Sequence, residues 1–110
     1  MAGEWIQVDF GETRLVQSVG TQGRHDNDNP RLDQWVTSYK FSHSDDGSSF
    51  SYVLDSTGGD RVFTGNTDRD TVVINDFDSP ITARYFRLVV HTWNRAVALR
   101  WELYGCNNGK

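Results

Sequence analysis

Hydrophobic and polar residues alternate with a period of two along much of this chain, whereas a helical period is hard to find. In residues 4–11 (EWIQVDFG), Ile6, Val8 and Phe10 alternate with polar residues, which is typical of a half-buried strand. Residues 34–44 show the same alternation and are rich in β-branched and aromatic residues. Strands are predicted over residues 4–11, 14–22, 34–44, 50–54, 71–76, 83–93 and 98–106.

Turn-forming residues separate these segments. The stretch DDGSS (45–49) predicts a tight turn, so that the strands on either side of it form an antiparallel hairpin. Residues 56–70 are rich in glycine and polar residues and predict a long surface loop, and Pro80 is expected to end one strand before the next. Short strands at regular spacing without crossover helices predict an all-β fold, an antiparallel β-sandwich.

The aromatic residues supply most of the predicted core. Trp5, Trp35 and Trp101 lie within alternating strand segments, and core packing is the preferred interpretation for all three. In residues 83–93, Arg87 lies among apolar neighbours, which predicts a partly buried guanidinium held by carboxylate or carbonyl groups. Trp93 lies at a strand end, where ligand contact is an alternative to packing.

Composition limits the classes of function. The 110 residues carry 11 basic and 15 acidic side chains, a formal charge of −4, and the basic residues are scattered without a run. Binding to nucleic acid or to strongly anionic membranes by bulk charge is therefore not expected. No apolar run approaches the roughly 18 residues of a membrane span, and residues 1–5 lack the pattern of a signal peptide, so the chain as given is expected to be soluble. Residues 1–110 are predicted to form a single domain.

Several motifs together resemble one family. EWIQVDFG, VGTQGR, QWVTSYKFSHSDDGSSF, FTGNTDRDTVV, PITARYFRLVVHTWN and ALRWELYGC follow in the order and approximate spacing of the discoidin domains, the C-type domains of coagulation factors five and eight. The resemblance covers essentially all of residues 4–106. It implies a discoidin jelly-roll β-sandwich whose loops at one end bind glycans, phospholipid head groups, collagen or other proteins. It also implies a non-catalytic extracellular or cell-surface module used in recognition and cell adhesion.

The chain departs from the family pattern at its N-terminus. It begins at the EWIQVDFG strand, so about the first third of a typical domain is expected to be missing, including a cysteine that would bond to the only cysteine here, Cys106. From the residues alone, Cys106 is either the orphan of such a disulfide or an ordinary thiol, and the resemblance favours the orphan. The missing strands would leave a sheet edge uncovered, and such an edge invites pairing with a second chain. A homodimer that fills the gap is therefore an alternative function, as a structural or assembly unit.

Residues 24–33 (RHDNDNPRLD) form the most polar segment of the chain, between two strand-like segments. The resemblance implies that this segment is a binding loop at the end of the sandwich, exposed to a glycan or protein ligand. Solvation of a long turn is the alternative interpretation. The predicted ligand-binding residues are Arg24, His25, Asp26, Asp28 and Arg31, together with Trp93, Asn94 and Arg95 at the end of the strand 83–93.

Three other ligands are less favoured by the residues of this segment. The stretch TQGRH is similar to the collagen-binding discoidin-domain receptors, but only Arg24 carries over, so collagen is a minor option. Insertion into anionic phospholipid requires apolar loop tips flanked by cations, and this loop offers Leu32 among carboxylates. Membrane binding by this chain is therefore disfavoured. Calcium is an open option: Asp26 and Asp28 are weak candidate ligands, and so are Asn66, Asp68 and Asp70, although neither segment has the EF-hand pattern.

No arrangement of residues in the sequence indicates catalysis. His25, His43 and His91 lie far apart and have no metal-ligand spacing, and no serine lies in a nucleophile-elbow motif. We therefore expect a protein that is not an enzyme and has no cofactor, apart from the calcium option.

Overall fold

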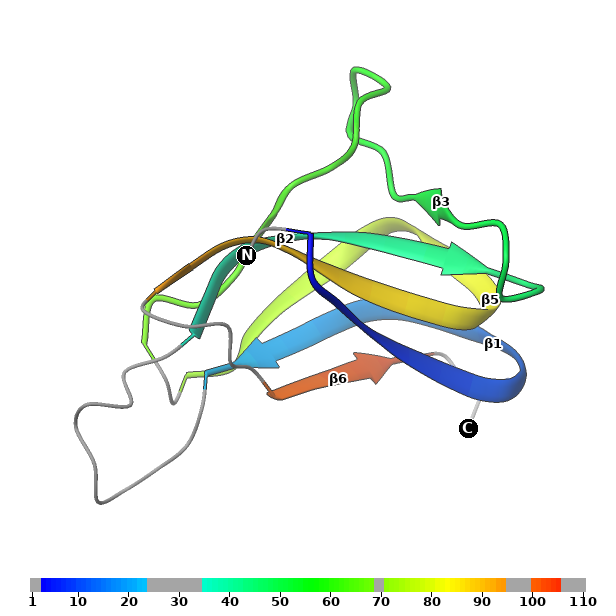
Figure 1. The fold of residues 1–110 in the computed structure, drawn as a ribbon, viewed down its shortest axis with the longest axis horizontal. Coiled ribbons are helices and arrows are strands. Elements are labelled where there is room, and N and C mark those ends of the chain that lie inside the picture. Colours follow the sequence, from blue (N-terminus) through cyan, green and yellow to red (C-terminus); the bar gives the residue numbers. More distant parts are fainter. Residues whose placement is uncertain (1–2, 24–34, 69–70, 95–99, 106–110) are drawn as a thin grey trace.

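A computed structural model describes residues 3–23, 35–68, 71–94 and 100–105. These residues contain strands and no helix, so none of them forms a helix long and apolar enough to cross a membrane (Figure 1). The predicted strand at 98–106 lies partly outside the described residues. Cys106 also lies outside them, so its interpretation as the orphan of a family disulfide stays a prediction. The strands are β1 (Trp5–Gln22), β2 (Trp35–Ser44), β3 (Ser51–Tyr52), β4 (Phe63–Thr64), β5 (Val73–Asn94) and β6 (Arg100–Tyr104).

The strands form one antiparallel sheet in the order β3-β2-β5-β1-β6, and β4 also pairs with β2. β1 and β5 run side by side from the pair Trp5↔Val89 to the pair Thr21↔Val73. β2 extends this pair only along the C-terminal half of β5, and β6 extends it only along the C-terminal half of β1. The long strands bend between these halves, so the sheet folds over into two facing layers (Figure 1). This arrangement confirms the prediction of an all-β antiparallel sandwich.

β1 corrects the prediction of two separate strands at 4–11 and 14–22. Gly11 does not end a strand as the pattern predicts, because β1 continues through a bend, with a shift of register between Asp9 and Arg14. Gly11 has a φ of 78°, a conformation that costs glycine little, and its N–H donates to Asp9 Oδ1 at 2.8 Å. The glycine therefore bends the strand from one layer to the other.

β5 corrects a second prediction of the same kind. Pro80 does not separate two strands at 71–76 and 83–93, since β5 runs through it from Val73 to Asn94. The register between β1 and β5 shifts where Val16 pairs with Ile81 and Ser18 with Asp76, so Pro80 falls in the interval that has no ladder partner. Proline is tolerated at such irregularities because no ladder hydrogen bond is lost there.

The predicted hairpin turn at 45–49 is confirmed. Asp46 Oδ1 accepts hydrogen bonds from the N–H groups of Ser48 and Ser49 at 2.8 and 2.9 Å, and these bonds lower the pKa of the Asp46 carboxyl. The returning strand is much shorter than the predicted 50–54, because β3 covers only Ser51–Tyr52. β2 is thus covered along its outer edge by two short strands, β3 and β4.

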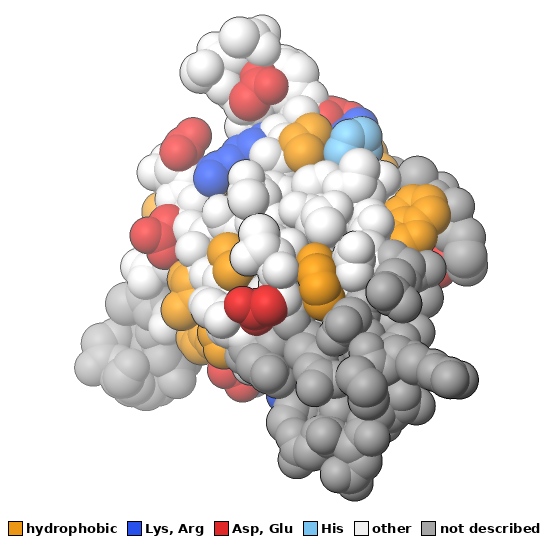
Figure 2. Space-filling model, turned by 90° about the vertical axis from the view of Figure 1, so that its left-hand side faces the viewer, with side chains coloured by type: hydrophobic (Ala, Val, Ile, Leu, Met, Phe, Trp, Pro, Cys, Tyr) orange, Lys and Arg blue, Asp and Glu red, His pale blue; other side chains and the backbone are white. Residues whose placement is uncertain are grey.

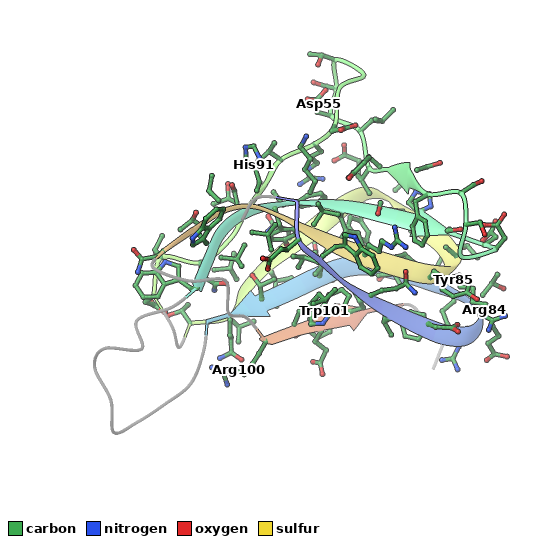
Figure 3. All side chains as sticks on the ribbon, viewed as in Figure 1. Asp55, Arg84, Tyr85, His91, Arg100 and Trp101 are labelled. Atoms are coloured by element: carbon green, nitrogen blue, oxygen red, sulfur yellow. The ribbon has the colours of Figure 1, made fainter. Side chains whose placement is uncertain are left out.

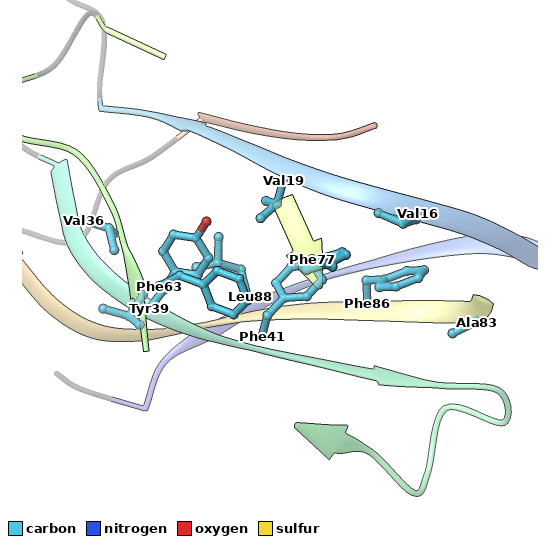
Figure 4. Packing of buried hydrophobic residues seen from close by; sticks show 11 residues of the cluster. Val16, Val19, Val36, Tyr39, Phe41, Phe63, Phe77, Ala83, Phe86 and Leu88 are labelled. Atoms are coloured by element: carbon cyan, nitrogen blue, oxygen red, sulfur yellow. The ribbon is translucent and has the colours of Figure 1, made fainter. Parts of the chain in front are cut away.

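The core lies between the layers and is built from aromatic rings (Figure 4). Phe41 of β2 is fully buried, and its ring centroid lies 5.4 Å from that of Phe77 and 6.2 Å from that of Trp101, which belong to the opposite layer. Tyr39 is also fully buried; burial raises its pKa to about 12, and its hydroxyl accepts a hydrogen bond from Asn75 Nδ2 at 3.2 Å. The residues with the least exposure therefore tie the two layers together.

Trp5 does not belong to this core, which contradicts the interpretation of its strand pattern. Its side chain is 50% exposed on the outer face of the first layer, whereas Trp35 and Trp101 are half-buried. Arg87 is stacked between two rings, with Cζ 3.9 Å from the Trp5 centroid and 3.7 Å from the Phe50 centroid, and its Nε donates to Gln7 Oε1 at 2.8 Å. The prediction of a partly buried guanidinium bonded to a carboxylate or carbonyl group is therefore confirmed, with an amide carbonyl as the acceptor, and two aromatic faces add to it.

Candidate functional site

Three connections between strands leave from the same end of the sandwich, which we call the loop end. Pairing of Trp35 with Asn94 and of Gln22 with Arg100 sets the ends of β1, β2, β5 and β6 side by side. The connections 23–34, 65–72 and 95–99 start or finish at these strand ends, and Figure 1 shows the strand ends on one side of the molecule. The opposite end carries the turn 45–49 and the bends of β1 and β5. In Figure 3, Arg100 lies at the loop end, while Arg84 and Tyr85 lie far from it.

The predicted site residues divide into two groups. Arg24, His25, Asp26, Asp28, Arg31 and Arg95 lie outside the described residues. Trp93 and Asn94 are the last two residues of β5, and both are half-buried. Trp93 packs against the hydrophobic core, so only part of its side chain faces solvent at the loop end. The segments 24–33 and 93–96, which the sequence singles out separately, are thus anchored at the same end of the fold.

Asn66 holds the loop end together from inside. Its side chain is 1% exposed, and Nδ2 donates to the backbone oxygens of Thr21 at 2.9 Å and Thr71 at 2.8 Å. The N–H groups of Gly65 and Asn66 donate to Thr37 O and Val36 O, both at 2.8 Å. The connection 65–72 is therefore bonded to the end of β1 and to the start of β2, the two strands that carry residues 24–33 between them.

β6 is fixed to the same place by one further bond. Arg100 Nε donates to Gly23 O at 2.9 Å, which ties the first residue of β6 to the last described residue before residue 24. The alternation pattern contains no signal for this contact, because Arg100 and Gly23 are far apart in sequence. The described part of the loop end is consequently a rigid rim of backbone held by one buried amide and one guanidinium.

A group of three hydroxyls lies beside this rim, and the sequence pattern does not predict it. Thr92 Oγ1 is hydrogen-bonded to Thr37 Oγ1 and, at 2.5 Å, to Ser38 Oγ. The register between β2 and β5 shifts on both sides of Ser38, and this irregularity turns two consecutive residues of β2 toward the same partner. Hydroxyls donate and accept, so the group can hydrogen-bond a polar ligand that reaches the strand ends.

The side chains on this face are of mixed character. Figure 2 views the molecule from the loop end and shows hydrophobic, acidic and polar side chains interspersed on the described part of the surface.

Of the two histidines outside segment 24–33, His91 is exposed and His43 is half-buried, and burial is the main cause that lowers the pKa of His43. His43 lies against the Phe86 ring of the core, with 6.5 Å between the ring centroids.

The weaker candidate calcium ligands have structural partners. Asp68 accepts from Thr71 through both carboxylate oxygens, at 2.7 Å from the backbone N–H and 2.8 Å from the hydroxyl. Asn66 Nδ2 is bonded to Thr21 and Thr71, and Asp70 lies outside the described residues. Among the residues that the structure describes, no three His, Cys, Asp or Glu side chains gather as a metal site requires. Calcium binding by Asp26 and Asp28 stays a prediction, since both lie outside those residues.

A family model decides the identity of this fold. The model of the F5/8 type C domain matches residues 1–103, nearly the whole chain. The chain belongs to the F5/8 type C (discoidin) domain family. The resemblance carried by the strand motifs is therefore confirmed, and so is the jelly-roll type of the sandwich.

Individual relatives agree with this assignment. Lactadherin of Mus musculus is 42% identical over 105 residues, which are 96% of this chain and 22% of the relative. The structure of discoidin II from Dictyostelium discoideum is 31% identical with a TM-score of 0.80, covering 94% of this chain and 37% of that chain. The CBM32 of AlyQ, solved in complex with 4,5-unsaturated mannuronic acid, is 19% identical with a TM-score of 0.63, covering 96% of this chain and 73% of that chain. At that identity, the likeness to the CBM32 shows a shared fold alone.

Family membership defines a broad class of function. F5/8 type C domains are binding modules and are generally non-catalytic, and relatives of this chain point to extracellular modules that bind carbohydrate, phospholipid or protein. Lactadherin, retinoschisin and neuropilin-1 are secreted or cell-surface proteins, which confirms the predicted location. The chain spans less than half the length of these curated relatives, 22% of mouse lactadherin and 45% of mouse retinoschisin.

Proposed function

We propose that this F5/8 type C domain is a non-catalytic recognition module that binds a glycan or an extracellular protein at the loop end. Residues 24–33 and 93–96 supply the contacts in this proposal, with Arg24, Asp28 and Asn94 among the groups that bond the ligand.

The main support for this proposal is the set of hydrogen bonds that fix the strand ends at the loop end. Three connections leave from one rim, and the bonds of Asn66 and Arg100 join the end of β1, the start of β2 and the start of β6 within that rim. Binding loops supported by a rigid scaffold lose less conformational entropy on binding, which favours recognition at such an end. A segment dense in donors and acceptors, anchored in this way, suits polar ligands such as the hydroxyls of a glycan.

The test is a glycan array and a panel of extracellular matrix proteins, followed by titration of the best ligand with Arg24→Ala and Asp28→Ala. Loss of a hydrogen bond to a charged group costs about 1.5 to 3 kcal/mol, so each variant is expected to raise the Kd roughly 10-fold to 100-fold. Arg14→Ala is the matched control, because Arg14 is an exposed arginine near the bend of β1, paired with Glu12. Equal affinity of all three variants and the parent would rule out segment 24–33 as the binding site.

A second function, self-association, is favoured by two uncovered edges of the sheet, of which the N-terminal half of β1 is the proposed contact. Within the described residues, the N-terminal half of β1 pairs with β5 alone and β6 pairs with β1 alone. Between these two edges lies a groove of about 420 Å³, with the lining residues Gln7, Val8, Phe10, Trp101, Glu102 and Leu103. Ile6 faces the inner side, opposite the buried Leu88, yet it is 36% exposed because no described strand covers it.

The N-terminal half of β1 can pair with the same strand of a second copy of the chain, because its side chains are complementary in that arrangement. Antiparallel pairing of two β1 edges about Val8 would set Ile6 against Phe10 of the second copy and Gln7 against its Asp9. No two like charges would then lie directly opposite, which is the arrangement that stabilises paired strands. Asp9 is also neutralised within its own chain, because Arg84 Nε and Nη2 donate to its two oxygens at 2.7 and 3.0 Å and lower the pKa of its carboxyl.

Sedimentation equilibrium over micromolar concentrations tests the self-association. The parent is expected to form a dimer and Ile6→Lys a monomer, since a lysine on an edge strand opposes pairing. Val62→Lys places the same charge at an exposed apolar position away from this edge and is expected to leave the dimer intact. A parent that sediments as a monomer at every concentration would end this second proposal.

A further inference from the structure

A second concave site lies on the outer face of the layer formed by β6, the C-terminal half of β1 and the start of β5. The groove has a volume of about 260 Å³ and opens to solvent beside the loop end. Its floor is Gly20, which pairs with Ile74 on one side and Glu102 on the other. The residues that line it are Gly20, Thr21, Gln22, Val72, Arg100, Trp101, Glu102 and Tyr104.

One wall of the groove depends on the absence of a side chain at position 20. A Cβ atom on Gly20 would lie 2.9 Å from Tyr104 Cε2 and 3.0 Å from the Tyr104 hydroxyl oxygen. The Tyr104 ring therefore rests over the backbone of β1 and forms one wall, half-buried. Val72, which is 45% exposed, supplies an apolar group to the same groove.

Polar groups in the groove are held in place by neighbours. Burial and the negative charge of the nearby Glu102 carboxylate raise the pKa of the Tyr104 hydroxyl. Arg100 is oriented by its bond to Gly23 O, and Gln22 pairs with Arg100 in the ladder. One aromatic ring, one carboxylate, one guanidinium and one amide thus surround a single small space.

We propose that this groove binds one neutral pyranose ring of a glycan. The ring would pack against Tyr104, its hydroxyls would donate to Glu102, and Arg100 and Gln22 would donate to its oxygens. Because the negative charge of Glu102 and the positive charge of Arg100 cancel, the groove favours a polar, uncharged ligand over an acidic or phosphorylated one. Its volume lies below the roughly 300 to 1,000 Å³ of pockets that hold drug-sized ligands, which limits the occupant to about one ring.

This site goes beyond the loop-end proposal and does not depend on it. The groove uses strand residues of β1 and β6 with Val72, whereas the loop-end proposal uses residues 24–33 and 93–96. A ligand bound across both would have one sugar in the groove and further groups over the loop end. The two sites can therefore fail separately, and variants distinguish them.

The experiment is a titration of the ¹⁵N-labelled chain with methyl glycosides of D-galactose, D-glucose and D-mannose at millimolar concentrations, followed by amide chemical shifts. At least one glycoside is expected to shift the amides of Gly20, Gln22 and Glu102 in a saturable manner. Tyr104→Ala removes the packing surface and is expected to weaken binding about tenfold. Tyr52→Ala removes an exposed tyrosine elsewhere and should leave the Kd unchanged.

Two further variants distinguish a loss of binding from a loss of folding. Tyr104→Phe keeps the ring and removes its hydroxyl, so sugar binding should persist, while Glu102→Gln keeps the shape and should weaken binding. A dispersed amide spectrum shows in each case that the variant is folded. The proposal is overturned if none of the three glycosides shifts the groove amides, or if Tyr104→Ala and Glu102→Gln both bind as the parent does.

Discussion

Replacing Phe41 with alanine is expected to lower the free energy of unfolding by about 3 to 5 kcal/mol, because the substitution empties the centre of the core. Phe41 is 0% exposed, and its ring contacts Phe63, Phe77, Phe86 and Trp101, with centroid distances between 5.4 and 6.4 Å. These rings come from both layers, so the cavity left by alanine would open at the centre of the sandwich and could not be filled by one neighbour moving.

The measurement is chemical denaturation followed by circular dichroism. Domains of this size are stable by only about 5 to 15 kcal/mol, so Phe41→Ala is expected to lower the denaturation midpoint markedly or to prevent folding at room temperature. Leu54→Ala is the matched control, because Leu54 is an apolar side chain that is 52% exposed, and its loss should cost less than about 0.5 kcal/mol. A loss of stability for Phe41→Ala as small as that of the control would contradict the arrangement of the core.

The second large effect is expected at Gly65, where the addition of one methyl group should destabilise the fold by about 1 to 3 kcal/mol. A Cβ atom there would lie 2.4 Å from the backbone oxygen of Val36 and 3.1 Å from the carbonyl carbon of Thr37. Both contacts are with backbone, which cannot rotate away. Gly65→Ala would therefore push the connection 65–72 off β2 and weaken the bonds from Gly65 N to Thr37 O and from Asn66 N to Val36 O.

Gly59→Ala provides the comparison for this prediction. The nearest heavy atom to a Cβ at Gly59 is Asp55 Oδ2 at 3.6 Å, an ordinary contact, so the same chemical change should be nearly neutral. Amide hydrogen exchange adds a second readout, since Gly65→Ala should increase exchange at Asn66 and in the first residues of β2. Equal stability of the two alanine variants would mean that the connection 65–72 does not lie against β2.

The sequence pattern predicts the type of fold because alternation has a direct cause. Ile6, Val8 and Phe10 face one side and Gln7 and Asp9 the other, and a two-layer sandwich is the arrangement that buries such faces. The turn at 45–49 can be predicted in the same way, because the hydrogen bonds of Asp46 lie within four consecutive residues. Local signals of this kind can be interpreted without knowledge of the partner strand.

Errors in the strand predictions arise where partners far apart in sequence decide the outcome. Gly11 and Pro80 are usual signals of a strand end, yet both lie in long strands that bend together and support each other through the bend. The error at Trp5 is of another kind: Trp5 alternates in step with Gln7 and Asp9, so its outer face follows from the local pattern, and the core interpretation rested on its being aromatic. Its stacking on Arg87, by contrast, depends on the pairing of β1 with β5.

The candidate site is predictable only in part for the same reason. Polarity singles out residues 24–33, and the strand-end position singles out Trp93 and Asn94, since both signals are local. The Asn66 bonds, the hydroxyl group around Thr92 and the groove over Gly20 depend on cross-strand register. Gly20 in particular has no local mark in the sequence, because its importance comes from Tyr104, which lies close to it only after β6 has paired with β1.

Mapping of the bound ligand tests the central claim, recognition at the loop end, most directly. The ligand selected on the glycan array or the protein panel is titrated into the ¹⁵N-labelled chain, and the amide shifts are assigned by residue. The largest shifts are expected in residues 24–33 and 93–96 and at their anchors Gly23 and Trp35. Shifts concentrated at the opposite end, in the turn 45–49 and the bend at Gly11, with residues 24–33 unchanged, would contradict the account.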